Sequence, residues 1–99
     1  MMEQRFNRLT EAEEERLALL AEECAEVIQV VGKILRHGYE SRNPLLASPS
    51  NVELLQKEIG HVEYAIQLLD QAGDVSISAI MDAAQDKKRT IHRWLHHQD

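Results

Sequence analysis

The residues best suited to chemistry lie in a nine-residue pattern that occurs twice in the chain, at residues 19–27 and again at residues 54–62. Both copies read Leu-Leu-x-x-Glu-apolar-x-x-Val, and each carries a second polar group three positions after the glutamate. The first copy therefore holds Glu23 and Glu26, and the second holds Glu58 and His61. Residues three apart are neighbours on a helix surface, so each pair presents two adjacent side chains. Antiparallel packing of two such helices would bring the pairs together, which predicts a polar cluster beside the core.

Carboxylates spaced in this way are suited to holding a hard divalent cation such as Mg²⁺. Phosphate oxygens can complete the coordination shell of such a cation. The chain has no glycine-rich phosphate-binding loop, so any phosphate chemistry should depend on the metal and on basic side chains. The basic candidates for binding a substrate are Lys33, Arg36, Lys87 and Lys88. The alternative is structural, because glutamates beside an apolar helix stripe commonly form ion pairs across an interface.

Three long helices must position these groups. Capping-box patterns at residues 10–13 and 50–53 mark the starts of the first two helices, which we expect to end near His37 and Ala72. A third helix is expected over residues 76–97. The predicted fold is all-α, a bundle of three to four helices around an antiparallel hairpin.

The remaining segments belong to the same domain. The 99 residues are too few for more than one domain. Residues 38–50 are rich in Gly, Pro, Ser and Asn and are predicted to form a loop, and residues 1–9 are predicted to be a flexible arm.

Apolar residues at alternating spacings of three and four predict which helix faces are packed. The first helix has such a stripe, and so does the second. The predicted stripes are Leu17, Leu20, Cys24, Val27, Val31 and Ile34, and Val52, Leu55, Ile59, Val62, Ile66 and Leu69. Cys24, the only cysteine, is accordingly predicted to be a small buried residue.

Composition restricts the class of protein. The formal net charge of −6 argues against a broad nucleic-acid-binding surface. No apolar run approaches the roughly 18 residues of a membrane span, so we expect no membrane partner and a cytoplasmic location.

The two motifs, with their flanks, resemble a known family. Glu-Glu-Cys-Ala-Glu at residues 22–26 and Glu-Ile-Gly-His at residues 58–61 are similar to the Glu-Glu-x-x-Glu and Glu-x-x-Asp pair of the MazG-like, all-α nucleoside triphosphate pyrophosphohydrolases. Lys-Ile-Leu-Arg-His-Gly-Tyr-Glu-Ser after the first motif and Trp-Leu-His-His-Gln near the end resemble small MazG-like proteins of phages and bacteria. The resemblance covers about residues 17–97.

The resemblance implies a helical bundle assembled as a dimer or tetramer. It also implies a hydrolase that converts a nucleoside triphosphate to the monophosphate and pyrophosphate with Mg²⁺. Carried over to this sequence, Glu23, Glu26 and Glu58 become metal ligands, with His61 at the fourth position. Glu22 or Glu23 would act as the base that takes a proton from water.

His61 departs from the family pattern, which has Asp at that position. A neutral imidazole is a softer ligand than a carboxylate and suits Mn²⁺ better than Mg²⁺. Three functions therefore remain open. The first is a metal-dependent pyrophosphohydrolase, the second a weakened relative that binds nucleotides or regulates, and the third a helical assembly module in which the glutamates form interface ion pairs.

Overall fold

The structure is a computed structural model that describes residues 6–45 and 48–98. Within these residues it contains three α-helices and no strand, which confirms the all-α prediction. The helices are α1 (Glu11–His37), α2 (Asn51–Gln71) and α3 (Ile77–Thr90), and α3 continues into a 3₁₀ turn, η1 (Ile91–Arg93). Residues 1–5 of the predicted arm and residues 46–47 of the predicted loop lie outside the described residues.

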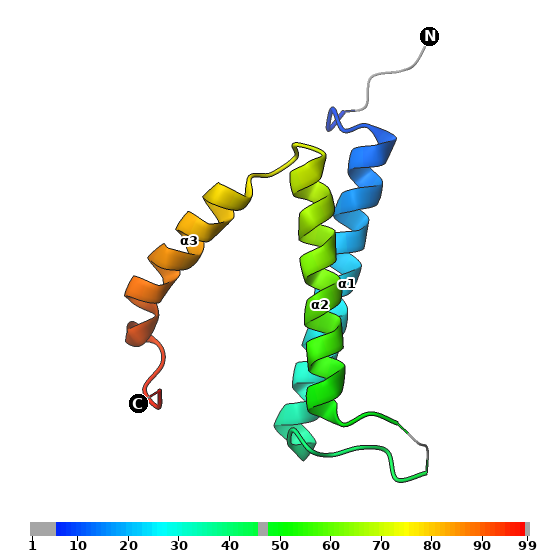
Figure 1. The fold of residues 1–99 in the computed structure, drawn as a ribbon, viewed down its shortest axis with the longest axis vertical. Helices are drawn as coiled ribbons and strands as arrows, with labels where there is room; N and C mark the ends of the chain where they lie inside the picture. The colour runs from blue at the N-terminus through cyan, green and yellow to red at the C-terminus, as the bar shows by residue number, and fades with distance from the viewer. Residues whose placement is uncertain (1–5, 46–47, 99) are drawn as a thin grey trace.

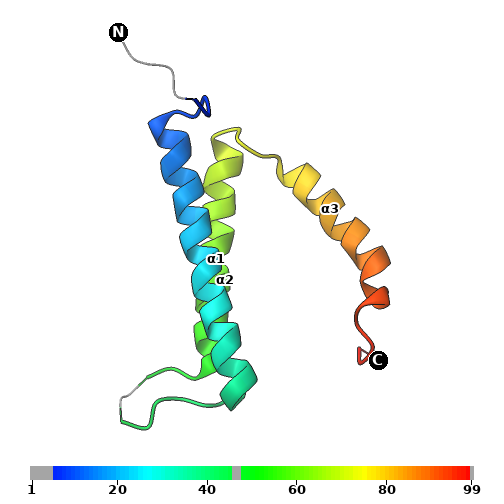
Figure 2. The same cartoon turned by 180° about the vertical axis from the view of Figure 1, so that it is seen from behind.

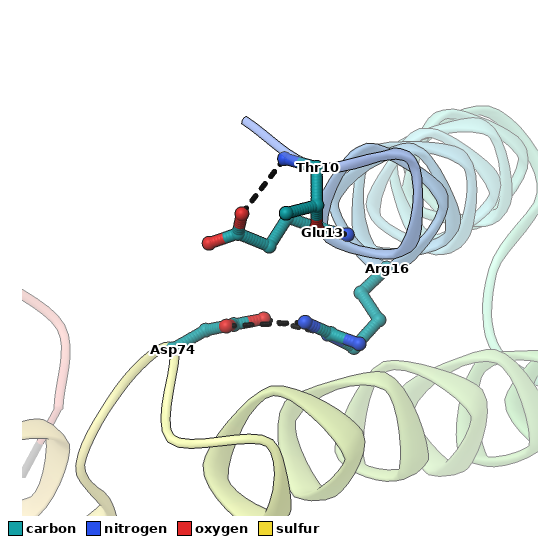
Figure 3. Close-up of polar contacts among 4 residues, drawn as sticks. All are labelled: Thr10, Glu13, Arg16 and Asp74. Atoms are coloured by element: carbon teal, nitrogen blue, oxygen red, sulfur yellow. Dashed lines mark hydrogen bonds and ion pairs between the residues drawn. The ribbon is translucent and has the colours of Figure 1, made fainter. Parts of the chain in front are cut away.

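Helix α1 begins at the predicted capping box. The Thr10 hydroxyl accepts a hydrogen bond from the Glu13 N–H at 3.1 Å, and the Thr10 N–H donates to the Glu13 carboxylate at 2.8 Å, as Figure 3 shows. At the other end Gly38 takes a φ of 89°, a left-handed value that favours glycine, and its N–H donates to the Ile34 carbonyl. Both predicted ends of this helix are confirmed.

Helix α2 begins with only half of the predicted capping box. The Ser50 hydroxyl accepts from the Glu53 N–H at 3.3 Å, as expected. The Glu53 carboxylate, however, accepts from the Ser50 hydroxyl at 3.2 Å and lies 3.6 Å from the Arg42 guanidinium. Competition from these two donors explains why Glu53 does not reach back to the backbone as Glu13 does.

Helices α1 and α2 form an antiparallel hairpin, side by side in both views of the chain (Figures 1 and 2). The buried apolar residues of this hairpin are Val30, Ala65 and Leu69. The predicted stripes are therefore only partly right, since Cys24 and Ile59 are exposed.

The packed faces are rotated by about one residue from the most apolar ones. The rotation places Glu23 and Glu58 between the helices and leaves aliphatic residues outside. Small Ala65, which is fully buried, lets the helices approach there. The prediction for Cys24 is wrong because it followed the apolar stripe, whereas the helices pack along the adjacent mixed face.

An ion pair fastens the end of the hairpin opposite the loop. Arg16 of α1 meets Asp74, in the turn after α2, with two contacts of 2.6 and 3.2 Å (Figure 3). Gly73 supplies the positive φ of 82° that this turn requires, and the Asp74 N–H donates to the Leu69 carbonyl. This ion pair therefore holds the beginning of α1 against the turn that follows α2.

Helix α3 stands away from the hairpin (Figures 1 and 2). It is shorter than predicted, because residues 94–98 are not helical. The end of a helix that packs against nothing has little stability in water. The Thr90 hydroxyl also donates hydrogen bonds to the carbonyls of Asp86 and Lys87, in competition with the backbone N–H groups that would continue the helix. The large apolar residues Ile77, Ile80 and Met81 of this helix are exposed. The predicted bundle is, within one chain, a two-helix hairpin with a separate third helix.

No helix in the described ranges has both the length and the apolarity needed to cross a bilayer.

Candidate metal centre

The structure brings the four predicted ligands together at the middle of the hairpin. Glu23 and Glu26 come from α1, and Glu58 and His61 come from α2. One potential ligand atom from each residue lies within 4.8 Å of every other. Helical spacing alone positions each pair, and the antiparallel register of the hairpin places one pair opposite the other.

Two of the carboxylates are inside the helix interface. Glu58 is 8% exposed, and the Glu23 side chain is 15% exposed. In each, one carboxylate oxygen is buried without a hydrogen-bond partner. A buried oxygen of this kind is unfavourable unless something compensates it, so the cluster has unsatisfied capacity for a cation.

Two basic side chains compensate these carboxylates only in part. The His61 Nδ1 atom lies 3.3 Å from the Oε2 atoms of both Glu23 and Glu58, longer than a strong charge-assisted hydrogen bond. Lys57 approaches the other Glu58 oxygen at 3.8 Å. His61 is about half exposed, so the cluster is open to solvent on that side.

The titration of the cluster reflects the crowding of negative charge. A hydrogen bond shared with Glu58 raises the pKa of Glu26, and the charges of Glu58, Glu23 and Glu22 and partial burial add to the increase. The same shared hydrogen bond lowers the pKa of Glu58, with help from His61 and Lys57 against the opposing effect of burial. Like charges this close favour retention of one proton between them.

The donor set fits a divalent cation. Three carboxylates supply hard oxygen ligands, and the imidazole extends the range toward transition ions such as Mn²⁺. The buried oxygens of Glu23 and Glu58 that lack a hydrogen-bond partner are the structural observation behind this fit. A cation would also relieve the repulsion among these carboxylates that helps to raise the pKa of Glu26.

The remaining predicted site residues fall in three places. Glu22 is exposed at the edge of the cluster, four positions before Glu26. Lys33 and Arg36 line a pocket at the loop end of the hairpin. Lys87 and Lys88 lie on α3, away from the hairpin, and are exposed, so one chain does not bring them to the cluster.

Sequence reasoning missed three side chains near these groups. Lys57 contacts Glu58, and His37 and Arg42 line the same pocket as Lys33 and Arg36. Lys33, Arg36 and His37 lie near the C-terminal end of α1, where the helix dipole favours basic side chains. Arg42 follows this run of basic residues by only five positions, and that closeness in sequence could have added it to the predicted substrate-binding residues.

Comparison of the chain with models of protein families, with curated proteins and with solved structures finds no match.

Proposed function

We propose that this protein is a metal-dependent nucleoside triphosphate pyrophosphohydrolase. The observation that carries the proposal is the convergence of Glu23, Glu26, Glu58 and His61, with two buried carboxylate oxygens that lack a hydrogen-bond partner. The resemblance of these motifs to the MazG-like family supplies the reaction. The products would be a nucleoside monophosphate and pyrophosphate.

Each residue of the cluster has a proposed role. Glu23, Glu26 and Glu58 would hold Mg²⁺ or Mn²⁺, with His61 completing the set on the exposed side. A divalent cation bound there supplies charge neutralisation for phosphate oxygens. Glu22 and Glu23 are the candidates to accept the proton of the attacking water as a P–O bond between the α- and β-phosphates breaks. Glu22, being exposed, is also free to exchange that proton with solvent.

Self-association is part of the proposal. A homodimer or homotetramer would cover surface that one chain leaves bare. The described residues bury only three apolar side chains fully, while Ile28 is 71% and Leu35 is 82% exposed on α1. A second copy could also bring Lys87 and Lys88 of its α3 near the cluster.

His61 supports a second candidate function, a weakened relative that binds nucleotides or regulates. Replacing a carboxylate by an imidazole removes one negative charge from the cation site, and Mg²⁺ depends strongly on charged oxygen ligands. The fold and pocket would then persist without useful turnover.

Product analysis separates these candidates. Purified protein is incubated with a panel of nucleoside triphosphates in Mg²⁺ and separately in Mn²⁺, and the products are resolved by chromatography. The same assay is run on Glu23→Gln, on His61→Asp and on Glu63→Gln, a control with an equal charge change at an exposed position of α2.

The outcomes differ between the candidates. Monophosphate and pyrophosphate that disappear in Glu23→Gln and persist in Glu63→Gln would establish the enzyme. Activity only in His61→Asp would support the weakened relative. No product from any variant in either metal would reject the hydrolase.

A further inference from the structure

The second concentration of polar side chains lies at the loop end of the hairpin. The last turn of α1, residues 41–44 and 48–49 of the loop after it, and the first turn of α2 line an open pocket of about 540 Å³. This volume is within the range of small-ligand sites, roughly 300–1,000 Å³. The pocket is separate from the acidic cluster, since it shares no lining residue with it.

The charge of this pocket is opposite to that of the whole chain. Acidic residues outnumber Lys and Arg by 17 to 11 in the sequence, yet no described Asp or Glu lines the pocket. Lys33, Arg36, His37 and Arg42 all do. Such a local excess of cationic groups attracts anions.

Two of these cations are unpaired. Lys33 and Arg36 make no ion pair with any residue in the described ranges. Arg42 lies 3.6 Å from Glu53, and both side chains are 56% exposed, so this contact is weak and can be exchanged. Their charged groups are therefore available to a ligand.

One wall of the pocket is fixed by hydrogen bonds. The Asn51 side chain, in a residue that is 7% exposed, donates to the Gly38 carbonyl at 3.1 Å. The N–H groups of Asn51 and Val52 donate to the carbonyls of Ser41 and Tyr39 at 2.8 and 2.9 Å. The first amides of α2 are thus already used, and an anion here would be held by side chains.

The pocket and the acidic cluster lie along the same strip of the hairpin. Lys33 follows Glu26 by seven residues, which is about two turns or 10 Å on the same face of α1. Leu54, which lines the pocket, precedes Glu58 by one turn of α2. A triphosphate chain with its contacts at both ends spans a comparable distance.

We propose that this basic pocket binds the terminal phosphates of a nucleoside triphosphate, with Lys33 and Arg36 as principal contacts, and releases pyrophosphate. The proposal rests on the pyrophosphohydrolase function for its substrate. Binding of the phosphate chain by the pocket itself requires no metal, because it depends on cationic side chains.

Isothermal titration calorimetry in excess EDTA tests the pocket by itself. The probes are inorganic phosphate, pyrophosphate, tripolyphosphate and a nucleoside triphosphate. Pyrophosphate and tripolyphosphate should bind more tightly than phosphate, and Lys33→Gln and Arg36→Gln should each weaken them about tenfold. Arg93→Gln, an equal charge change at an exposed residue of η1, should leave binding within about twofold.

Failure of the pocket and failure of the hydrolase are distinguishable. No binding in EDTA, or binding that Lys33→Gln and Arg36→Gln leave unchanged, would overturn the pocket even if the protein hydrolyses triphosphates. Metal-free binding that is retained in Glu58→Gln and lost in the pocket variants would support the pocket even if turnover is absent. Equal weakening by Arg93→Gln would indicate general charge attraction and would also overturn it.

Discussion

A buried carboxylate is the residue-scale feature on which the candidate site depends. Glu58 occupies the packed face of α2, where an apolar residue would serve stability better. Its partners, His61 and Lys57, lie beyond ideal hydrogen-bonding distance. A charged residue that replaces an apolar one in a packed interface, and that has no close ion-pair partner there, is typical of a binding site.

Removing the Glu58 charge should separate metal binding from stability. We expect Glu58→Gln to weaken Mn²⁺ binding by about tenfold or more, because one of three carboxylate ligands is lost. In EDTA the same variant should lower the free energy of unfolding only slightly, because the lowered pKa of Glu58 means that its carboxylate favours the folded state, while the easier burial of a neutral amide offsets part of that loss. Mn²⁺ binding is followed by electron paramagnetic resonance.

Glu63→Gln is the matched control for that measurement. It changes the same charge on the same helix at an exposed position, so Mn²⁺ binding should stay within about twofold of the wild type. Equal affinities for wild type, Glu58→Gln and Glu63→Gln would show that the cluster is not the metal site.

The pH dependence of metal binding should follow Glu26. The hydrogen bond shared with Glu58 raises the pKa of Glu26 above its usual value, near 4.3 for a free glutamate. A cation must displace this proton, so affinity should fall as pH drops through the raised pKa of Glu26. In Glu26→Gln, Mn²⁺ should bind more weakly and with a smaller pH dependence, measured by titration at several pH values.

The same proton affects stability without metal. Because its pKa is raised in the folded state, Glu26 contributes stability that is complete below the unfolded pKa and is lost as pH rises through the folded pKa. Glu58 has a lowered pKa in the folded state, so it contributes stability that is present above its unfolded pKa and is lost as pH falls through its folded pKa. Identical pH profiles for wild type and Glu26→Gln would contradict the shared proton.

At the scale of elements, local signals predicted more than the apolar pattern did. The box at Thr10 and Glu13 and the glycine at position 38 define both ends of α1, because capping depends on neighbours in sequence. The packed face was predicted less well. Cys24 was expected inside and Glu58 beside the core, whereas Cys24 is exposed and Glu58 is buried.

The reason is that in each hairpin helix the packed face is mixed and lies beside a more apolar one, and a single sequence does not say which of the two meets its neighbour. The four residues of the candidate cluster nevertheless lie together, since their pairs need only antiparallel packing to meet. The basic pocket was not predicted, because Arg42 comes close to Lys33 and Arg36 only through the path that the loop takes.

The cap of α1 can be tested directly. Thr10→Ala removes the acceptor for the Glu13 N–H and should lower the free energy of unfolding by about 1 kcal/mol. Thr10→Ser keeps a hydroxyl and should lose much less. Both values come from urea unfolding followed by circular dichroism at one protein concentration. An alanine variant as stable as the serine variant would mean that the cap contributes little.

At the scale of the whole molecule, the single chain is open. Its radius of gyration is 17.7 Å, whereas a compact domain of this length has about 13 Å. Helix α3 extends beside the hairpin without packing on it (Figure 1). This open shape leaves surface that a second copy would cover if the protein self-associates as proposed.

One exposed face of α1 has the spacing of an interhelical seam. Its members are all exposed and follow one another at alternating intervals of four and three residues, the heptad pattern of helices that pack lengthwise. They are Leu17, Ala21, Cys24, Ile28, Val31 and Leu35. This face points away from the packed side of α1 that carries Glu23, so a second copy could cover it without closing the cluster.

Charges placed on this seam should break the assembly. We expect the wild type to sediment as a multiple of the 11.3 kDa chain, and the double variant Ile28→Glu with Leu35→Glu to sediment as a monomer, because four carboxylates would meet in each dimer seam. Gln29→Glu adds charge at an exposed position outside the seam and should leave the mass unchanged.

Circular dichroism distinguishes dissociation from unfolding, and metal binding by the dissociated variant shows whether one hairpin suffices for the cluster. A monomeric wild type, or a double variant of unchanged mass, would remove the seam as the interface, and the exposed aliphatic residues of α3 would become the next surface to test.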